Sequence, residues 1–363
     1  MKKIGFVAAL LLAAFAMISC GNKTVDSTKW LDSFEDAKIA AQKENKQIIL
    51  FFSADDSDNL SLTLKEKLLF KDDFVTAETA KYVLVNLDFS ESKYQAAQVA
   101  EDASSEEKKA AEKAKKRLEE NMNVATYYSV QMSPTFYLTS KEGYYITQLL
   151  FDDTLSSIEG FDAEIASHEE EIKTFTDALA RTTQGTNLEK AKAIDDLYNQ
   201  TDRSFVYSLA PLAREGLKLD PKNESGVTNR FVVEIAQVEA MEAAMSNDIE
   251  KMIQVFDKAA ENKLLSAEQK QQMYYYAGYY LGGMGSTDYA RVREYIQKAY
   301  DADPQSDAAS GIQNLLRIVD ERIAETAQMN EDIKIENKTD SPSDDSAPTE
   351  NTGETKSAEG LKQ

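Results

Sequence analysis

The chain of 363 residues contains few of the side chains from which catalytic and metal sites are most often built. It has one cysteine, one histidine and one tryptophan. A disulfide within the chain needs two cysteines, and a zinc site of the Cys/His type needs three or four such ligands. The composition therefore excludes both kinds of site, and we expect no cofactor.

Basic residues are outnumbered by acidic ones. The chain has 41 Lys and Arg residues against 63 Asp and Glu residues, which gives a formal net charge of -22. Nucleic acids are held by clustered Lys and Arg side chains, so we expect no nucleic-acid partner. The chain does have an ordinary apolar fraction of 42% and enough length to bury two cores.

Residues 1–19 have the pattern of a targeting segment. Lysines at residues 2–3 precede an apolar run at residues 4–17 that is short for a bilayer span, and the run ends close to Cys20. The segment resembles a bacterial lipoprotein signal, with Met17 in place of the usual Leu. The resemblance implies a lipid on Cys20 that holds the chain to an inner or outer membrane of the cell envelope, facing the periplasm or the surface. An ordinary secretory signal is the alternative.

The first half of the chain is organised around residues 47–70. Residues 47–53 form an apolar run typical of a buried strand, residues 54–59 are mostly turn formers, and leucines at helical spacing follow from Leu60. We therefore predict a strand, an acidic turn and a helix that ends at Phe70.

Further elements complete an α/β unit around this stretch. We predict a helix at residues 29–43 capped by Asp26 or Ser27, a second strand at 82–89 parallel to the first, a strand pair at 131–140 and 144–151, and a closing helix at 162–181. Residues 90–123 are rich in Ala, Glu and Lys and are predicted to be a solvated helical insertion. Proline cannot donate a sheet hydrogen bond, so we expect Pro134 at a sheet edge or after a cis peptide bond.

Together these elements resemble a thioredoxin-fold domain. Within that family they are most similar to the periplasmic, disulfide-reductase-like proteins. The strand at residues 47–53, the Ser133-Pro134-Thr135 motif and the Glu142-Gly143 hairpin carry much of the resemblance. In that family a Cys-x-x-Cys lies at the strand-to-helix junction, and a cis-proline beside it receives extended peptide. Here the two cysteine positions correspond to Asp58 and Ser61, so the family's thiol–disulfide exchange is not implied. Pro134 is the cis-proline candidate.

Other roles are open to residues near this junction. Asp58 is expected to cap the following helix. A calcium loop of the EF-hand type is a sharper alternative, with oxygen ligands at the required spacing: Asp55, Ser57, Asn59, Ser61 and Glu66. Against it, Leu60 stands at the glycine position and Glu66 falls inside the predicted helix. His168 lies in a charged helix and is expected to be a solvated surface residue.

The strand pattern disappears in the second half of the chain. Segments with apolar residues three and four apart predict seven helices, at residues 187–199, 204–219, 228–246, 249–262, 267–281, 288–302 and 307–324. The fifth and sixth resemble a tetratricopeptide repeat, through small residues such as Gly278 and the Asp303-Pro304 turn. A generic helical bundle is the alternative. In the repeat family a concave surface binds peptide segments, which makes Tyr275 and Tyr279 candidate groove residues.

The predicted organisation has five parts. They are a signal peptide at residues 1–19, a tether at 20–28, an α/β thioredoxin-like domain at 29–182 with its insertion at 90–123, an all-α tetratricopeptide-like domain at 183–325 and an acidic tail at 326–363. The tail has almost no large apolar residue and is predicted to be disordered.

Two functions from different classes remain open. The first is a membrane-anchored envelope lipoprotein that binds a protein or peptide partner and has no enzymatic activity. The second is an accessory of a thiol–disulfide oxidoreductase, or a thioredoxin-family enzyme with other chemistry. The missing Cys-x-x-Cys and the isolated histidine favour the first.

Overall fold

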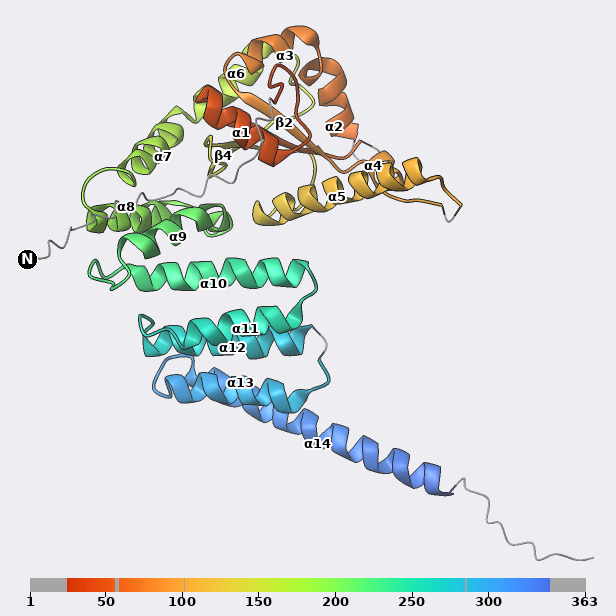
Figure 1. Cartoon of the computed structure of the whole chain (residues 1–363), viewed down its shortest axis with the longest axis vertical. Helices are drawn as coiled ribbons and strands as arrows, with labels where there is room; N and C mark the ends of the chain where they lie inside the picture. Colours follow the sequence, from red (N-terminus) through yellow and green to blue (C-terminus); the bar gives the residue numbers. More distant parts are fainter. Residues whose placement is uncertain (1–24, 56–58, 101, 285, 340–363) are drawn as a thin grey trace, which may run out of the picture. The chain divides into compact units, whose positions relative to one another are not determined.

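The structure, a computed structural model, describes residues 25–55, 59–100, 102–284 and 286–339 (Figure 1). The predicted signal peptide, Cys20, Asp58 and residues 340–363 of the predicted tail lie outside the described residues. The chain divides into two compact units, one up to Ser266 and one from Ala267. Among the described helices, none is both long enough and apolar enough to cross a bilayer.

A mixed four-stranded sheet in the order β2-β1-β3-β4 forms the centre of the first unit. The strands are β1 (Ile48–Ser53), β2 (Val83–Asp88), β3 (Thr135–Thr139) and β4 (Tyr145–Leu149). β1 pairs in parallel with β2 and antiparallel with β3, and β3 pairs antiparallel with β4. The sheet confirms the predicted α/β class, including the parallel strand pair and the hairpin.

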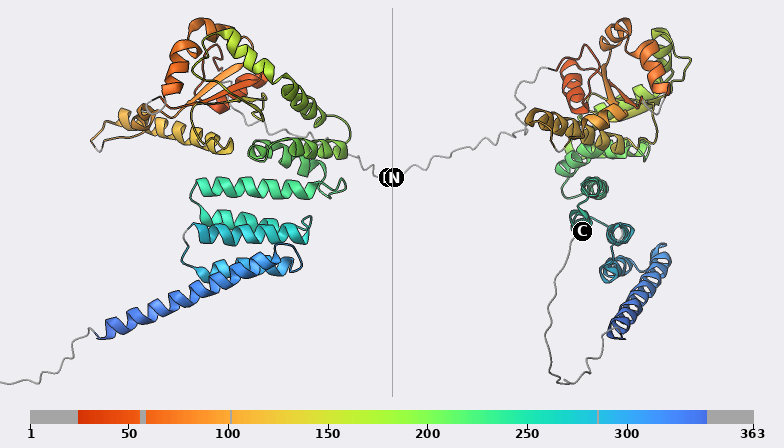
Figure 2. Two further views of the ribbon diagram at one scale, coloured as in Figure 1. Left: turned by 180° about the vertical axis from the view of Figure 1, so that it is seen from behind. Right: turned by 90° about the vertical axis from the view of Figure 1, so that its right-hand side faces the viewer.

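β1 is the core strand because both of its faces are buried. Ile49 and Phe51 enter one apolar cluster, where Phe51 stacks on Phe136 with ring centroids 4.2 Å apart. Leu50 and Phe52 enter a second cluster on the opposite face. Successive side chains of a strand point to opposite faces, so each face needs its own helical cover. Figure 2 shows helices on both sides of the sheet.

The described residues of this α/β part form seven α-helices. They are α1 (Phe34–Glu44), α2 (Asn59–Leu64), α3 (Asp72–Thr79), α4 (Glu91–Ala96), α5 (Ser105–Tyr127), α6 (Ile158–Ser167) and α7 (Glu169–Arg181). α4 and α5 form the predicted insertion. α1 begins later than predicted because Ser33 caps it by accepting a hydrogen bond from the Asp36 amide, so the expected cap at Asp26 or Ser27 is wrong.

Two helices predicted in the α/β part are interrupted. The helix expected at residues 60–70 is α2 followed by a π-helical segment, Lys65–Leu69, in which the amide of Phe70 donates to the carbonyl of Lys65 at 3.1 Å. The closing helix is divided at His168 into α6 and α7. A π-helical turn changes which side of a helix its residues face, and such turns are frequent at functional sites.

The helices that follow complete the first unit without a break in the core. They are α8 (Asn187–Gln200), a 3-10 turn (Val206–Leu209), α9 (Ala210–Leu219), α10 (Thr228–Met245) and α11 (Ile249–Ala260). Ile194, Leu197 and Phe231 belong to the same apolar cluster as Phe51. The predicted boundary at 182/183 therefore does not separate the compact units.

The described residues of the second unit form α12 (Ala267–Gly283), α13 (Tyr289–Ala302) and α14 (Ala309–Thr339). α13 packs against both α12 and α14. A Cβ atom on Gly278 would lie 2.6 Å from Ile296 Cδ1, so the absent side chain allows the close approach of α12 and α13. α14 continues beyond residue 325, so the predicted start of the tail lies inside a helix.

Candidate functional site

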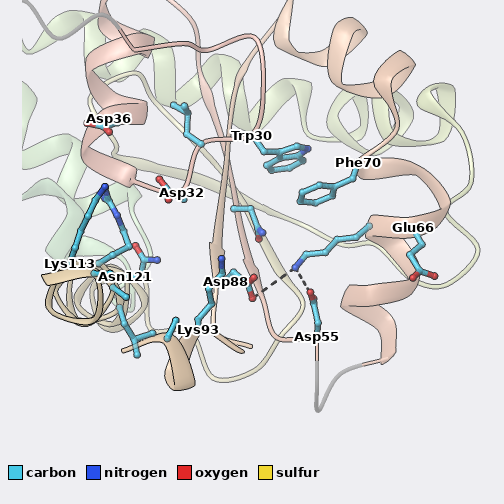
Figure 3. A pocket seen from close by; sticks show the side chains of 18 of the residues that line it. Trp30, Asp32, Asp36, Asp55, Glu66, Phe70, Asp88, Lys93, Lys113 and Asn121 are labelled. Atoms are coloured by element: carbon cyan, nitrogen blue, oxygen red, sulfur yellow. Dashed lines mark hydrogen bonds and ion pairs between the residues drawn. The ribbon is translucent and has the colours of Figure 1, made fainter. Parts of the chain in front are cut away.

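A cavity of about 970 Å³ opens at the strand-to-helix junction (Figure 3). Asp55 follows β1 and Asp88 ends β2, and the carboxyl ends of parallel strands meet at one edge of a sheet. The other walls come from residues 30–36, from the π-helical segment and from α4 and α5. We call this cavity the junction cleft.

A buried lysine lies in the junction cleft. Lys65 is 8% exposed, and its Nζ donates to Asp55 Oδ1 at 2.7 Å and lies 4.0 Å from Asp88 Oδ1. The ring centroids of Phe51 and Phe70 are each 5.7 Å from the same nitrogen. A buried cation is costly unless it is paired and hydrogen-bonded. The two carboxylates and the aromatic rings supply that compensation.

Two stacked aromatic side chains form one wall of the cleft. The ring centroids of Trp30 and Phe70 lie 5.6 Å apart at an interplanar angle of 7°. Figure 3 shows the two side chains next to each other. Trp30 Nε1 donates to the carbonyl of Leu69 at 2.7 Å, which satisfies the indole nitrogen. Trp30 also meets Phe51 edge-on at 5.9 Å. The wall is therefore held both by the core of the sheet and by the π-helical segment.

The cleft lining carries both signs of charge. Its basic residues are Lys65, Lys71, Lys93, Lys113 and Arg117, and its acidic residues are Asp32, Asp36, Asp55, Glu66 and Asp88. Lys93 comes from α4 and Lys113 from α5 (Figure 3), and Arg117 also belongs to α5. The insertion is therefore more than the solvated excursion that the sequence predicted. A balanced lining in a chain of net charge -22 suits a ligand that carries both charges, such as a peptide segment.

The predicted junction residues lie in different environments. Ser61 lies on α2 and is 0% exposed. Asp58 and Ser57 lie outside the described residues, and Glu66 is exposed on the π-helical segment. The Ser133–Pro134 peptide bond is cis, and Thr135 after it pairs with Phe52 at the end of β1. Pro134 thus lies at the edge of the sheet where β1 ends, although it is not among the residues that line the cleft.

His168 is not the solvated residue that its charged surroundings predicted. Its side chain is 21% exposed, with Nδ1 3.1 Å from both Thr147 Oγ1 and Glu171 Oε2, and Nε2 3.3 Å from Glu164 Oε1. Hydrogen bonds from Thr147 and then from His168 lower the pKa of Glu171. The break between α6 and α7 turns His168 toward β4, so the cluster fastens this corner to the sheet. In the described part of the chain, no group of three or more His, Cys, Asp or Glu side chains is placed to hold a metal ion.

The two candidate groove tyrosines lie on α12. Tyr275 lines a groove between α12 and α14. Tyr279 stacks on Tyr275 at 5.8 Å and is 55% exposed, but it does not line this groove.

Both parts of the chain are similar to known protein families or structures. Residues 34–150 match a family model described as a thioredoxin-like domain, and residues 227–324 match one described as an uncharacterised protein C-terminal domain. An uncharacterized protein of Treponema pallidum (strain Nichols) is 27% identical over 207 residues, which is 56% of this chain and 68% of that protein. A solved structure of a DsbH oxidoreductase is similar over 41% of this chain and 87% of its own, with 16% identity and a TM-score of 0.28. The family match and the mixed sheet give the fold: a thioredoxin-like domain, followed by a region of packed helices.

Proposed function

We propose that this chain is a lipid-anchored protein of the bacterial cell envelope whose thioredoxin-like domain binds a segment of a partner protein in the junction cleft. The proposal rests on one observation. Where a redox-active relative would present thiols, this chain has a cleft built around Lys65, which is held by Asp55 and Asp88. Such a site offers hydrogen bonds and charges to a ligand and no sulfur.

The chemistry of the junction supports binding over thiol exchange. Thiol–disulfide exchange begins when a thiolate attacks a disulfide sulfur. The only cysteine of the chain is Cys20, in the segment that resembles a lipoprotein signal. Ser61 has its side chain buried in α2, so its hydroxyl is out of reach of a substrate. The cleft offers instead an aromatic wall and paired charges, which are features of peptide recognition.

The lipid anchor has a direct test in the substitution Cys20→Ser. We expect this variant to leave the membrane fraction. The acyl chains are attached to the sulfur of the cysteine and to its amino group once it is the first residue of the mature chain, and serine offers no sulfur. Ser19→Ala keeps a small residue before the cysteine and should remain in the membrane. Mass spectrometry of the mature amino terminus would show the lipid directly. A Cys20→Ser chain that stayed membrane-bound would contradict the anchor.

The cleft has a test that separates binding from catalysis. With the wild-type chain, which keeps its one cysteine, we expect no reduction of insulin disulfides above the uncatalysed rate, and measurable turnover would favour the redox alternative. A photo-crosslinking amino acid in place of Lys113, which lines the cleft, should capture a protein in the envelope. The same amino acid in place of Lys109, exposed on α5 outside the lining, is the matched control. Equal capture at both positions would contradict cleft binding.

The single tryptophan gives an independent signal for occupancy of the cleft. Trp30 is the only tryptophan of the chain and it lines the cleft beside Phe70. The captured partner, once purified, should therefore change the emission of Trp30 and protect it from acrylamide quenching.

A further inference from the structure

A second cavity, of about 1130 Å³, lies within the second unit between α12 and α14. Tyr275 and Tyr276 line it from α12, and Ile312, Leu315 and Ile318 line it from α14. The turn after α13, residues 303–308, completes the lining. We call this cavity the tyrosine groove. Its volume is above the roughly 300–1,000 Å³ of ordinary small-molecule pockets, so it has room for several side chains of a peptide.

The floor of the tyrosine groove is fixed by a buried amide. Gln271 is 3% exposed, and its Nε2 donates to the carbonyls of Ala299 at 3.2 Å and Asp303 at 2.7 Å. Its Oε1 accepts from Ser306 Oγ at 2.6 Å. These bonds tie α12 to the end of α13 and to the following turn. A groove that is already formed loses little entropy when a ligand binds.

The charge of the groove is one-sided, in contrast to the junction cleft. Its acidic residues are Glu268, Asp303 and Asp307, and no Lys or Arg is among the described residues that line it. Within the described part of the chain, none of these three carboxylates forms an ion pair. Tyr275 and Tyr276 line the groove beside these carboxylates, and aromatic rings attract cations as well. A cationic ligand is therefore favoured, and an acidic one is repelled.

We propose that the tyrosine groove docks a Lys- or Arg-containing segment of a partner protein. An aliphatic side chain of the segment packs between Tyr275 and the apolar face of Leu315 and Ile318, and its cations lie toward Glu268 and Asp307. The apolar wall supplies contact area and the carboxylates select the charge. The proposal concerns a different surface from the junction cleft and does not depend on it.

The test measures peptide binding to the full chain carrying Cys20→Ser, by fluorescence anisotropy at physiological salt. The probe is a dye-labelled peptide of repeating Lys-Leu-Ala, and the comparison probe has Glu in place of Lys. Glu268→Gln with Asp307→Asn should weaken binding of the Lys probe about fivefold, the effect of two exposed charge pairs. Asp301→Asn with Glu325→Gln makes the same change in net charge at exposed positions outside the lining, and should leave the affinity nearly unchanged.

The aromatic wall is tested in the same assay. Tyr275→Ala should weaken binding about tenfold, as for an anchor at the centre of an interface. Tyr289→Ala removes a similar ring from α13 outside the lining and serves as the control. Circular dichroism would show that the helices persist in each variant.

Three outcomes would overturn the proposal. The first is equal weakening by the two charge variants, which would mean that net charge alone attracts the probe. The second is equal binding of the Glu probe. The third is tighter binding after truncation at residue 339, which would assign the groove to the chain's own residues 340–363.

Discussion

Replacing Lys65 with methionine is expected to lower the free energy of unfolding of the first unit by about 3 kcal/mol, near the lower end of the range for breaking a buried ion pair. Methionine keeps most of the length and apolar stem of lysine but removes the charge. Asp55 and Asp88, with side chains 28% and 18% exposed, then lie near each other without the cation that offsets their repulsion. The contacts of the ammonium group with Phe51 and Phe70 are lost as well.

Urea unfolding followed by Trp30 fluorescence measures this effect in the first unit alone, because Trp30 is the only tryptophan. Lys67→Met is the matched control. Lys67 is exposed and its Nζ donates to the carbonyl of Asp153 at 3.0 Å, so its loss should change the free energy of unfolding by less than about 0.5 kcal/mol. Lys65→Met with Asp55→Asn should recover part of the loss, since one orphaned charge is removed. Equal losses for the two single variants would show that Lys65 is not held as described.

The central sheet could be predicted because its signals are local. Residues 47–53 are apolar without interruption, which a strand buried on both faces requires, and the structure places Ile48–Ser53 in that position. The acidic turn after them and the second apolar run near Val83 imply a crossover and a parallel partner. Each of these inferences used neighbours in the chain, so tertiary contacts did not have to be known.

Lys65 was missed because its role depends on groups that are distant in the sequence. The sequence offered one signal, a lysine surrounded by Leu64, Leu68 and Leu69 in a helix that packs against the core. A cation at such a position needs a buried partner. The partners, Asp55 and Asp88, follow different strands, and only the parallel register of β1 and β2 brings them together. The π-helical segment that directs Lys65 into the cleft has no recognised sequence pattern.

Trp30 shows how a tertiary contact can override a helical pattern. The helix predicted at residues 29–43 included Trp30. In the structure the backbone of Leu31 is hydrogen-bonded to β2 instead. Its amide donates to the carbonyl of Leu84 at 2.9 Å, and its carbonyl accepts from the amide of Asn86 at 2.8 Å. An extended Leu31 prevents the helix from starting before Ser33. Trp30 therefore lies before the start of the helix, where its side chain lines the cleft.

Asp220 shows the converse case, a turn that was identified without its chemistry. The helix predicted at residues 204–219 ends directly before Asp220. The carboxylate of Asp220 accepts hydrogen bonds from Ser225 and from the backbone of Glu224, and it also accepts from the buried hydroxyl of Thr228. Burial raises the pKa of Asp220, but these hydrogen bonds outweigh it and lower the pKa to about 2. Only the folded loop brings these donors to one side chain.

The continuity of the core across the predicted boundary at 182/183 leads to the second large effect. Gly216 on α9 faces the ring of Phe231 on α10, which is 0% exposed. A Cβ atom at Gly216 would lie 2.4 Å from Phe231 Cε2 and 2.7 Å from its Cδ2, much closer than van der Waals contact. Gly216→Ala should therefore lower the free energy of unfolding of the first unit by about 2.5 kcal/mol, although alanine favours the helix by about 1 kcal/mol.

Gly160→Ala adds the same atom to a helix of the same unit, α6, where the nearest side-chain atoms are 3.5 Å away. It should stabilise the unit by about 0.5–1 kcal/mol, the gain in helix propensity alone. Phe231→Leu replaces the ring with a smaller side chain, so the cost of Gly216→Ala should be smaller in that background, and the difference measures the clash. If both glycine variants stabilised the first unit, α9 and α10 would not be packed as described.

The loss of stability in Gly216→Ala is expected to be visible in Trp30 fluorescence. Phe231 and Phe51 belong to one apolar cluster, so displacement of the Phe231 ring weakens the core that also supports the junction cleft.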